Sequence, residues 1–131
     1  MKQLNSYALA EIDGGKKVSY AYDVLDDATG MPLKQNIMEN FTVLDDILAV
    51  EFQSIWSFIQ SNKLTSNDVL KLVIVTSVGG GDRITYVYDA LDNDGNLQNE
   101  NGHGKFYAVN QELISVISKI KAYIRTNILE G

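Results

Sequence analysis

The sequence predicts an α+β domain made of two tandem copies of one unit, in which several strands are followed by a helix. Three observations predict it: an internal duplication, short apolar runs separated by turn residues, and a helical apolar pattern that closes each copy. With 131 residues, 45% hydrophobic and 21% charged, the chain has the composition of one globular domain. We therefore expect a single domain, 1–131, divided into repeat one (1–65) and repeat two (66–131).

The duplication is clearest in two matching stretches: residues 17–26 read KVSYAYDVLD and residues 83–92 read RITYVYDALD, an offset of 66. After a gap of one residue near Thr29 the offset becomes 65, and the match continues to the end of each unit. The matched apolar positions include Leu48, Ile55 and Ile59 in repeat one and Leu113, Ile120 and Ile124 in repeat two. Two similar units in tandem predict packing about a pseudo-twofold axis.

Each unit is expected to begin with a strand, Gln3–Ile12 or Val69–Val78, followed by a glycine-rich turn. A second strand carries a tyrosine pair, and both rings lie on one face because side chains alternate along a strand. An acidic turn then leads to two further short strands in each unit, with antiparallel pairing because the turns are short. These short strands are predicted at Leu33–Met38 and Asn40–Val43, and at Leu97–Glu100 and Lys105–Val109, with a loop in the polar segment Asn99–Gly104.

Each unit is expected to end in a helix, Asp46–Asn62 or Gln111–Asn127. Apolar residues recur there at helical spacing. Asp45 and Asn110 stand immediately before these helices, and both residue types are favourable N-caps. The predicted order is thus ββββα-ββββα.

Residues 23–34, DVLDDATGMPLK, resemble the second hairpin of the PUR repeat, a Whirly-like unit of four strands and a helix. Residues 49–52, AVEF, followed by Phe58 and Ile59, are similar to the helix of that family. The resemblance implies two intertwined repeats that bind single-stranded DNA or RNA. The hairpin is basic in the family, whereas here only Lys34 keeps a positive charge at the matching positions.

The candidate nucleic-acid site combines Lys17 and Arg83, at matching hairpin starts, with Lys34, and adds Tyr20 and Tyr86 as platforms for stacking bases. The alternative is that the tyrosines face the helices and build the core, which strand alternation favours. The net charge of −6 opposes broad binding to phosphate backbones. It leaves open a second hypothesis, an acidic protein-interaction or inhibitor module that binds no nucleic acid.

Several kinds of chemistry lack support in the sequence. The chain has no cysteine, and its one histidine, His103, stands without a second ligand or a nucleophile signature. Residues 92–96, DNDGN, place leucine and histidine where a calcium loop needs glycine and glutamate. We expect no catalytic residues, no cofactor and no metal, and hence a binding module that is not an enzyme.

The sequence also bears on location and assembly. No apolar run reaches the length of about 20 residues that a membrane span needs. The absence of cysteine is compatible with a reducing compartment, and we expect a cytoplasmic protein without membrane contact. Homodimerisation is a further hypothesis, because Trp56 and Phe58 are expected to leave apolar surface on the first helix.

Overall fold

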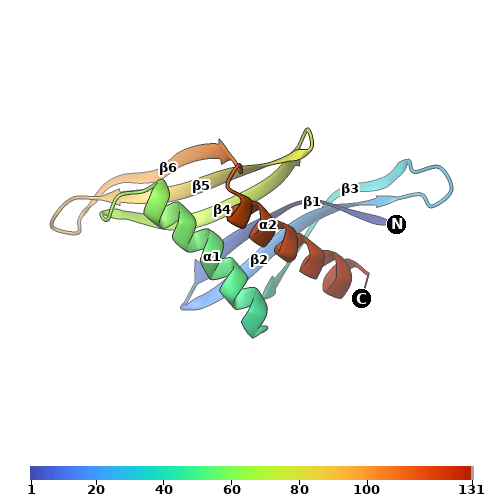
Figure 1. The fold of residues 1–131 in the computed structure, drawn as a ribbon, viewed down its shortest axis with the longest axis horizontal. Helices are drawn as coiled ribbons and strands as arrows, with labels where there is room; N and C mark the ends of the chain where they lie inside the picture. The colour runs from blue at the N-terminus through green and yellow to red at the C-terminus, as the bar shows by residue number, and fades with distance from the viewer. Residues whose placement is uncertain (131) are drawn as a thin grey trace.

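The computed structural model describes residues 1–130 as two βββα units in tandem (Figure 1). The first unit comprises β1 (Lys2–Ile12), β2 (Gly15–Leu25), β3 (Pro32–Thr42) and α1 (Asp46–Asn62). The second comprises β4 (Asp68–Val78), β5 (Gly81–Leu91), β6 (Leu97–Tyr107) and α2 (Gln111–Tyr123), which continues as a π-helical segment, Ile124–Leu129.

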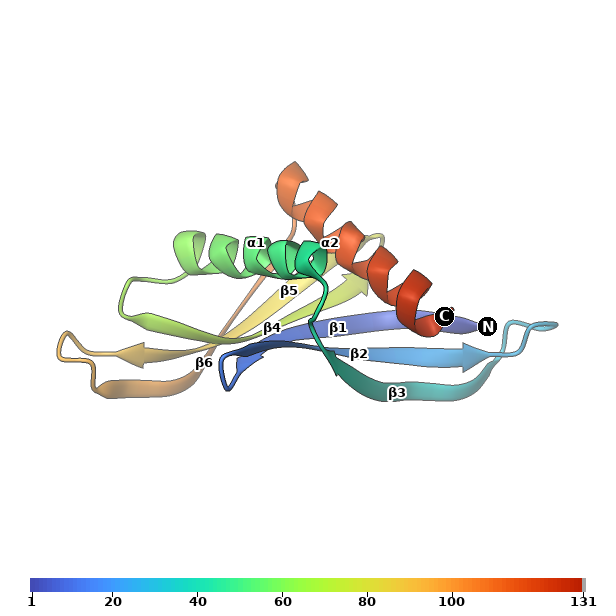
Figure 2. The same cartoon turned by 90° about the horizontal axis from the view of Figure 1, so that it is seen from below.

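All six strands form one antiparallel sheet in the order β3-β2-β1-β4-β5-β6, so the two units join through β1 and β4. Both helices lie on the same face of this sheet, and the opposite face carries no element of the described chain (Figure 2). The predicted α+β class, the tandem units, the antiparallel pairing and the packed helices are confirmed. No helix within residues 1–130 is long and apolar enough to cross a membrane.

The prediction of four strands in each unit is wrong, because the third and fourth predicted strands are one continuous strand. In each unit this strand passes through a residue with positive φ, Asn36 (55°) or Asn101 (56°), and then continues. The polar and glycine-rich segment Asn99–Gly104 is therefore part of β6. Such a composition is tolerated there because β3 and β6 are the edges of the sheet, where one side of the backbone faces solvent.

The pseudo-twofold axis passes between the two central strands. Ala8 and Ile74 occupy equivalent positions in the repeats, at the offset of 66, and they pair directly with each other. The neighbouring pairs obey the same symmetry: Tyr7 lies opposite Val75, and Leu9 lies opposite Val73. The two units that the duplication produced are thus related by a rotation about the centre of the sheet.

A second symmetric feature is a bulge at the same level of each unit. The carboxylate of Asp23 accepts hydrogen bonds from the Asn5 side chain (2.8 Å) and from the backbone N–H of Asn36 (2.8 Å). The carboxylate therefore joins three strands where their register shifts. The equivalent group in the second unit consists of Lys71, Asp89 and Asn101.

The core lies between the sheet and the two helices. Its central side chains include Tyr7, Leu9, Val18, Phe52 and Ile117, each at most 1% exposed. Both helices begin as predicted, since Asp45 accepts a hydrogen bond from the Leu48 N–H (2.9 Å) and Asn110 accepts one from the Leu113 N–H (3.0 Å). Helix and strand side chains together form one continuous cluster shared by the two units.

Candidate functional site

The uncovered face of the sheet, called here the outer face, is made of three rows of side chains that cross all six strands. The register places the rows between those that point into the core. From β3 to β6 they read Thr42, Lys17, Ala10, Leu72, Val87 and His103; then Asn40, Ser19, Ala8, Ile74, Thr85 and Lys105; then Met38, Ala21, Ser6, Thr76, Arg83 and Tyr107.

Within these three rows the charges are all positive, and the carboxylates of Asp23 and Asp89 lie on the same face beyond the rows, at the two bulges. The rows contain Lys17, Arg83 and Lys105 and no carboxylate, although the chain has 17 acidic residues. Among the described residues none of these three cations forms an ion pair, and the Nε atom of Arg83 is buried without a hydrogen-bond acceptor. The three rows therefore carry cations that no carboxylate of the described residues neutralises.

Lys17 and Arg83 lie at positions related by the pseudo-twofold axis. They stand on β2 and β5, three strand spacings apart, which is roughly 14 Å across the sheet. Between them the central strands present small or apolar side chains such as Ala8, Ala10 and Ile74. A shallow hollow of about 110 Å³ lies in this central region, lined in part by Ser6, Ser19 and Met38.

Tyr20 lies on the inner face, so the core alternative is the one that the structure supports for this residue. Its ring is 4% exposed and stacks beside Tyr22, with centroids 5.9 Å apart. The Tyr20 hydroxyl donates to the Glu39 carboxylate at 2.8 Å. Burial, followed by this bond to a carboxylate, raises the pKa of Tyr20 to about 12. A buried ring of this kind is not accessible for base stacking.

Tyr86 also points inward and packs against the core, but its surroundings differ from those of Tyr20. Gly104 stands opposite it on β6, where repeat one has Glu39. A Cβ atom at Gly104 would lie only 2.1 Å from Cζ of Tyr86, so the ring rests directly on the glycine backbone. Tyr88 rests on Gly102 in the same way, at 2.8 Å. Glycine on β6 thus makes room for two aromatic rings.

The remaining predicted residues are dispersed. Lys34 lies opposite Val24, beyond the bulge, and is not part of the three rows. Trp56, predicted to leave apolar surface, is only 8% exposed and stacks on Phe52 (5.5 Å). Phe58 is half-buried against Phe106. The apolar surface of α1 is instead formed by Ile47 (72% exposed) and Val50 (66%).

Sequence reasoning missed the contribution of β6 to the outer face. His103, Lys105 and Tyr107 alternate along this strand and all point outward, next to Val87, Thr85 and Arg83 of β5. Tyr107 is 57% exposed and is the aromatic ring available on this surface. The two-residue spacing of these side chains is typical of one face of a strand. The glycines at 102 and 104 made the same segment look like a loop.

The acidic turns have a structural role. The Asp92 carboxylate accepts hydrogen bonds from the backbone N–H groups of Asp94 (2.9 Å) and Asn96 (2.8 Å), as is typical of a tight turn.

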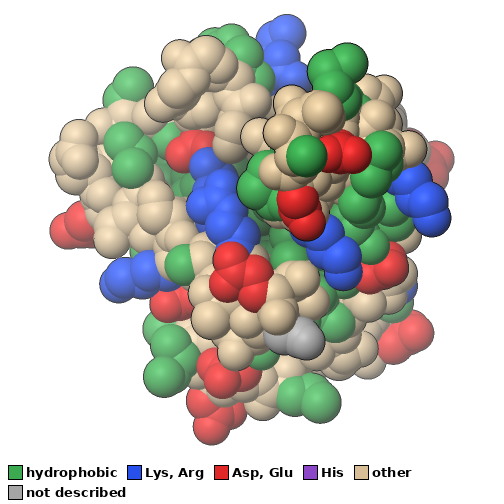
Figure 3. Space-filling view, turned by 90° about the vertical axis from the view of Figure 1, so that its right-hand side faces the viewer, with side chains coloured by type: hydrophobic (Ala, Val, Ile, Leu, Met, Phe, Trp, Pro, Cys, Tyr) green, Lys and Arg blue, Asp and Glu red, His purple; other side chains and the backbone are tan. Residues whose placement is uncertain are grey.

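Within residues 1–130 no group of three or more metal-ligating side chains is present. At the end of the molecule that carries the β2–β3 hairpin, acidic side chains are scattered among basic and hydrophobic ones (Figure 3).

The fold and the outer face together define a class of protein: a pseudosymmetric α+β domain with helices on one face of its sheet and an open face with unpaired cations. Comparisons with known proteins found no matching family model, no matching curated protein and no matching solved structure. The functional argument therefore depends on the surface itself.

Proposed function

We propose that this protein is a non-enzymatic binding module that holds single-stranded DNA or RNA across the outer face of its sheet. The observation that carries the proposal is the charge of the three rows on that face: Lys17, Arg83 and Lys105 without an intervening carboxylate, in a chain of net charge −6. We also propose that the chain is related to the PUR repeats and that the protein is located in the cytoplasm.

The chemistry of the outer face suits an extended, flexible polyanion. Cations on β2, β5 and β6 are spread over the width of the sheet, so they would contact phosphates along a strand and not a single phosphate group. The Tyr107 ring, opposite Arg83, offers a face on which a base can stack, worth about 1–3 kcal/mol. The small central side chains leave room for sugars and bases between these contacts.

The test is fluorescence anisotropy with labelled single-stranded DNA and RNA over a series of salt concentrations. We expect micromolar binding that weakens as salt rises, with a log–log slope of about −2 for three phosphate contacts at about −0.7 each. Lys17→Ala, Arg83→Ala and Lys105→Ala should each weaken binding and reduce the slope by about 0.7. Lys119→Ala, a change on the helix side, is the matched control and should leave binding unchanged.

Two results would count against this function. Absence of binding at low salt would remove it and favour the acidic protein-interaction module. Binding that responds to Lys119→Ala as strongly as to Lys17→Ala would show that the outer face is not the contact surface. Weaker binding of Tyr107→Ala, with an unchanged salt slope, would assign base stacking to that ring.

A further inference from the structure

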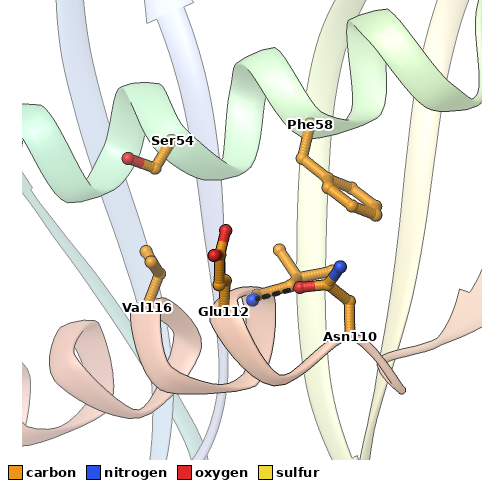
Figure 4. A pocket seen from close by; sticks show the side chains of 6 residues that line it. Ser54, Phe58, Asn110, Glu112 and Val116 are labelled. Carbon is orange, nitrogen blue, oxygen red and sulfur yellow. Dashed lines mark hydrogen bonds between the residues drawn. The ribbon is translucent and has the colours of Figure 1, made fainter.

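The opposite side of the molecule carries a groove between the two helices. Its first part, about 170 Å³, is lined by Ser54 and Phe58 of α1 and by Glu112 and Val116 of α2 (Figure 4). Its second part, about 440 Å³, shares Ser54 and Val116 and extends to Ile47 and Val50. In Figure 2 the N-terminal half of α2 rises away from the sheet beside α1. The two hollows are adjacent, because they share two lining residues, and together they are called the inter-helix groove here.

The inter-helix groove straddles the pseudo-twofold axis. Glu51 and Val116 are equivalent positions at the offset of 65, as are Ser54 and Lys119, and all four line its second part. The groove therefore lies on the same axis as the Ala8–Ile74 pair, but on the other side of the molecule. It is spatially separate from the outer face and independent of the nucleic-acid proposal.

The α1 side of the groove carries two exposed apolar side chains. Ile47 and Val50 are 72% and 66% exposed, and they stand one turn apart on α1. Exposed apolar side chains grouped around a groove are typical of a surface that another molecule covers.

The rim of the groove is acidic. Asp46, Glu51 and Glu112 line it, against one cation, Lys119. Burial raises the pKa of Glu51, and the charge of Lys119 offsets part of that effect. A second copy of this chain, with net charge −6, would bring like charges together at this rim. The charge of the groove therefore disfavours self-association and favours a cationic occupant.

We infer that the inter-helix groove is a docking site for a basic amphipathic helix of a partner protein. The apolar stripe of such a helix lies on Ile47, Val50 and Val116, and its lysines or arginines meet Asp46, Glu51 and Glu112. This is the helix-in-groove mode of recognition, in which residues at i, i+3, i+4 and i+7 supply the apolar anchors.

The probe for the test is a synthetic helical peptide of about 18 residues, or about five turns, with leucines on one face and lysines on the other. A peptide of the same composition in scrambled order and a leucine–glutamate helix are the comparison ligands. Binding to the full chain is followed by fluorescence anisotropy, and the contact surface is mapped by NMR chemical-shift changes. We expect saturable binding of the leucine–lysine helix at least about tenfold tighter than that of either comparison peptide, a difference of about 1.4 kcal/mol.

Variants locate the site. Ile47→Lys with Val50→Lys should weaken binding at least tenfold, whereas Val69→Lys, at an apolar position on β4 that is 48% exposed, should not. Glu51→Lys with Glu112→Lys should transfer the preference to the leucine–glutamate helix. All these positions are exposed or half-buried, and circular dichroism verifies that each variant folds.

Three outcomes would overturn the inference. They are equal binding of the scrambled peptide, an effect of Val69→Lys equal to that of the groove variants, and shift changes confined to other surfaces. Dimerisation of the chain, abolished by the groove variants and competing with the peptide, would assign the groove to a second copy.

Discussion

Phe58 of α1 lies against Phe106 of β6, with ring centroids 6.2 Å apart and ring planes inclined by 32°. The equivalent pair joins Tyr123 of α2 to Phe41 of β3, at 6.1 Å and 32°. The C-terminal end of each helix therefore reaches the edge strand of the other unit. The two repeats exchange their helices across one sheet, and each depends on the other for the cover of its edge strand.

The exchange predicts that residues 1–65 alone do not form a stable folded monomer. Without the second unit, Phe41 loses the Tyr123 ring, Phe58 loses Phe106, and β1 loses the partner strand β4. Circular dichroism with light scattering should show an unfolded chain or a dimer in which a second copy supplies the missing edge. Cooperative thermal unfolding of residues 1–65 at the mass of one chain would contradict this.

Gly104→Ala tests the contact between Tyr86 and the β6 backbone. The new methyl group would meet the ring at 2.1 Å, so the ring must move, and we expect the free energy of unfolding to fall by about 1–3 kcal/mol. Gly81→Ala is the matched control: its Cβ would lie 3.8 Å from the nearest atom, so the change should be under about 1 kcal/mol. In a Tyr86→Ala background the cost of Gly104→Ala should largely disappear. An equal cost in both backgrounds would show that the ring contact is not its cause.

Tyr7 makes the stability of the fold sensitive to alkaline pH. Burial, aided by the negative charges of Asp82 and Glu51, holds the pKa of Tyr7 well above its ordinary value of 10.0. The folded state therefore keeps a proton that the unfolded state loses above about pH 10. The contribution of Tyr7 to stability is fully present below that pH and is lost as pH rises towards the folded pKa.

Tyr7→Phe separates this effect from the hydrogen bond of the same side chain. The hydroxyl donates to the carbonyl oxygen of Ile117 in α2 at 3.2 Å, so its loss should cost about 1 kcal/mol at neutral pH. Denaturant unfolding between pH 8 and pH 11 should also show a shallower alkaline decline than the unmodified chain. Tyr107→Phe, at an exposed ring, is the control. Unchanged slopes in Tyr7→Phe would refute the assignment.

The contact between Lys121 and Asp82 links α2 to β5. The two side chains are 16% and 12% exposed, and Lys121 also donates to the Ser77 hydroxyl at 3.0 Å. Lys121→Met would leave the Asp82 carboxylate nearly buried without its cation, and we expect a loss of about 2–3 kcal/mol in the free energy of unfolding.

Lys71→Met is the matched comparison for this ion pair. Lys71 lies 3.5 Å from Asp89 and is 38% exposed, so its removal should cost about 1 kcal/mol or less. Chemical denaturation of both variants measures the difference. Equal costs would show that burial does not strengthen the Lys121–Asp82 pair.

Much of the fold is encoded locally, which is why the sequence predicts it. The duplication, the N-caps Asp45 and Asn110, the bounds of α1 and the glycine turns depend on residues within a few positions of each other. Alternation also places Tyr20 and Tyr22 on one face. The count of strands was wrong because breaks were predicted at Glu39 and in the polar segment Asn99–Gly104, whereas pairing with β2 and β5 keeps both edge strands continuous.

The sequence by itself determined that two similar units exist, where their helices begin, and which side chains share a face. Only the tertiary structure decided which face is covered, because each helix packs on strands of the other unit, far from it in the sequence. The same long-range packing buried Tyr20, placed Lys17, Arg83 and Lys105 together on the uncovered face, and formed the groove beside Ile47 and Val50. Strand alternation has two equivalent phases, and the choice between them is made by contacts between residues that lie far apart in the sequence.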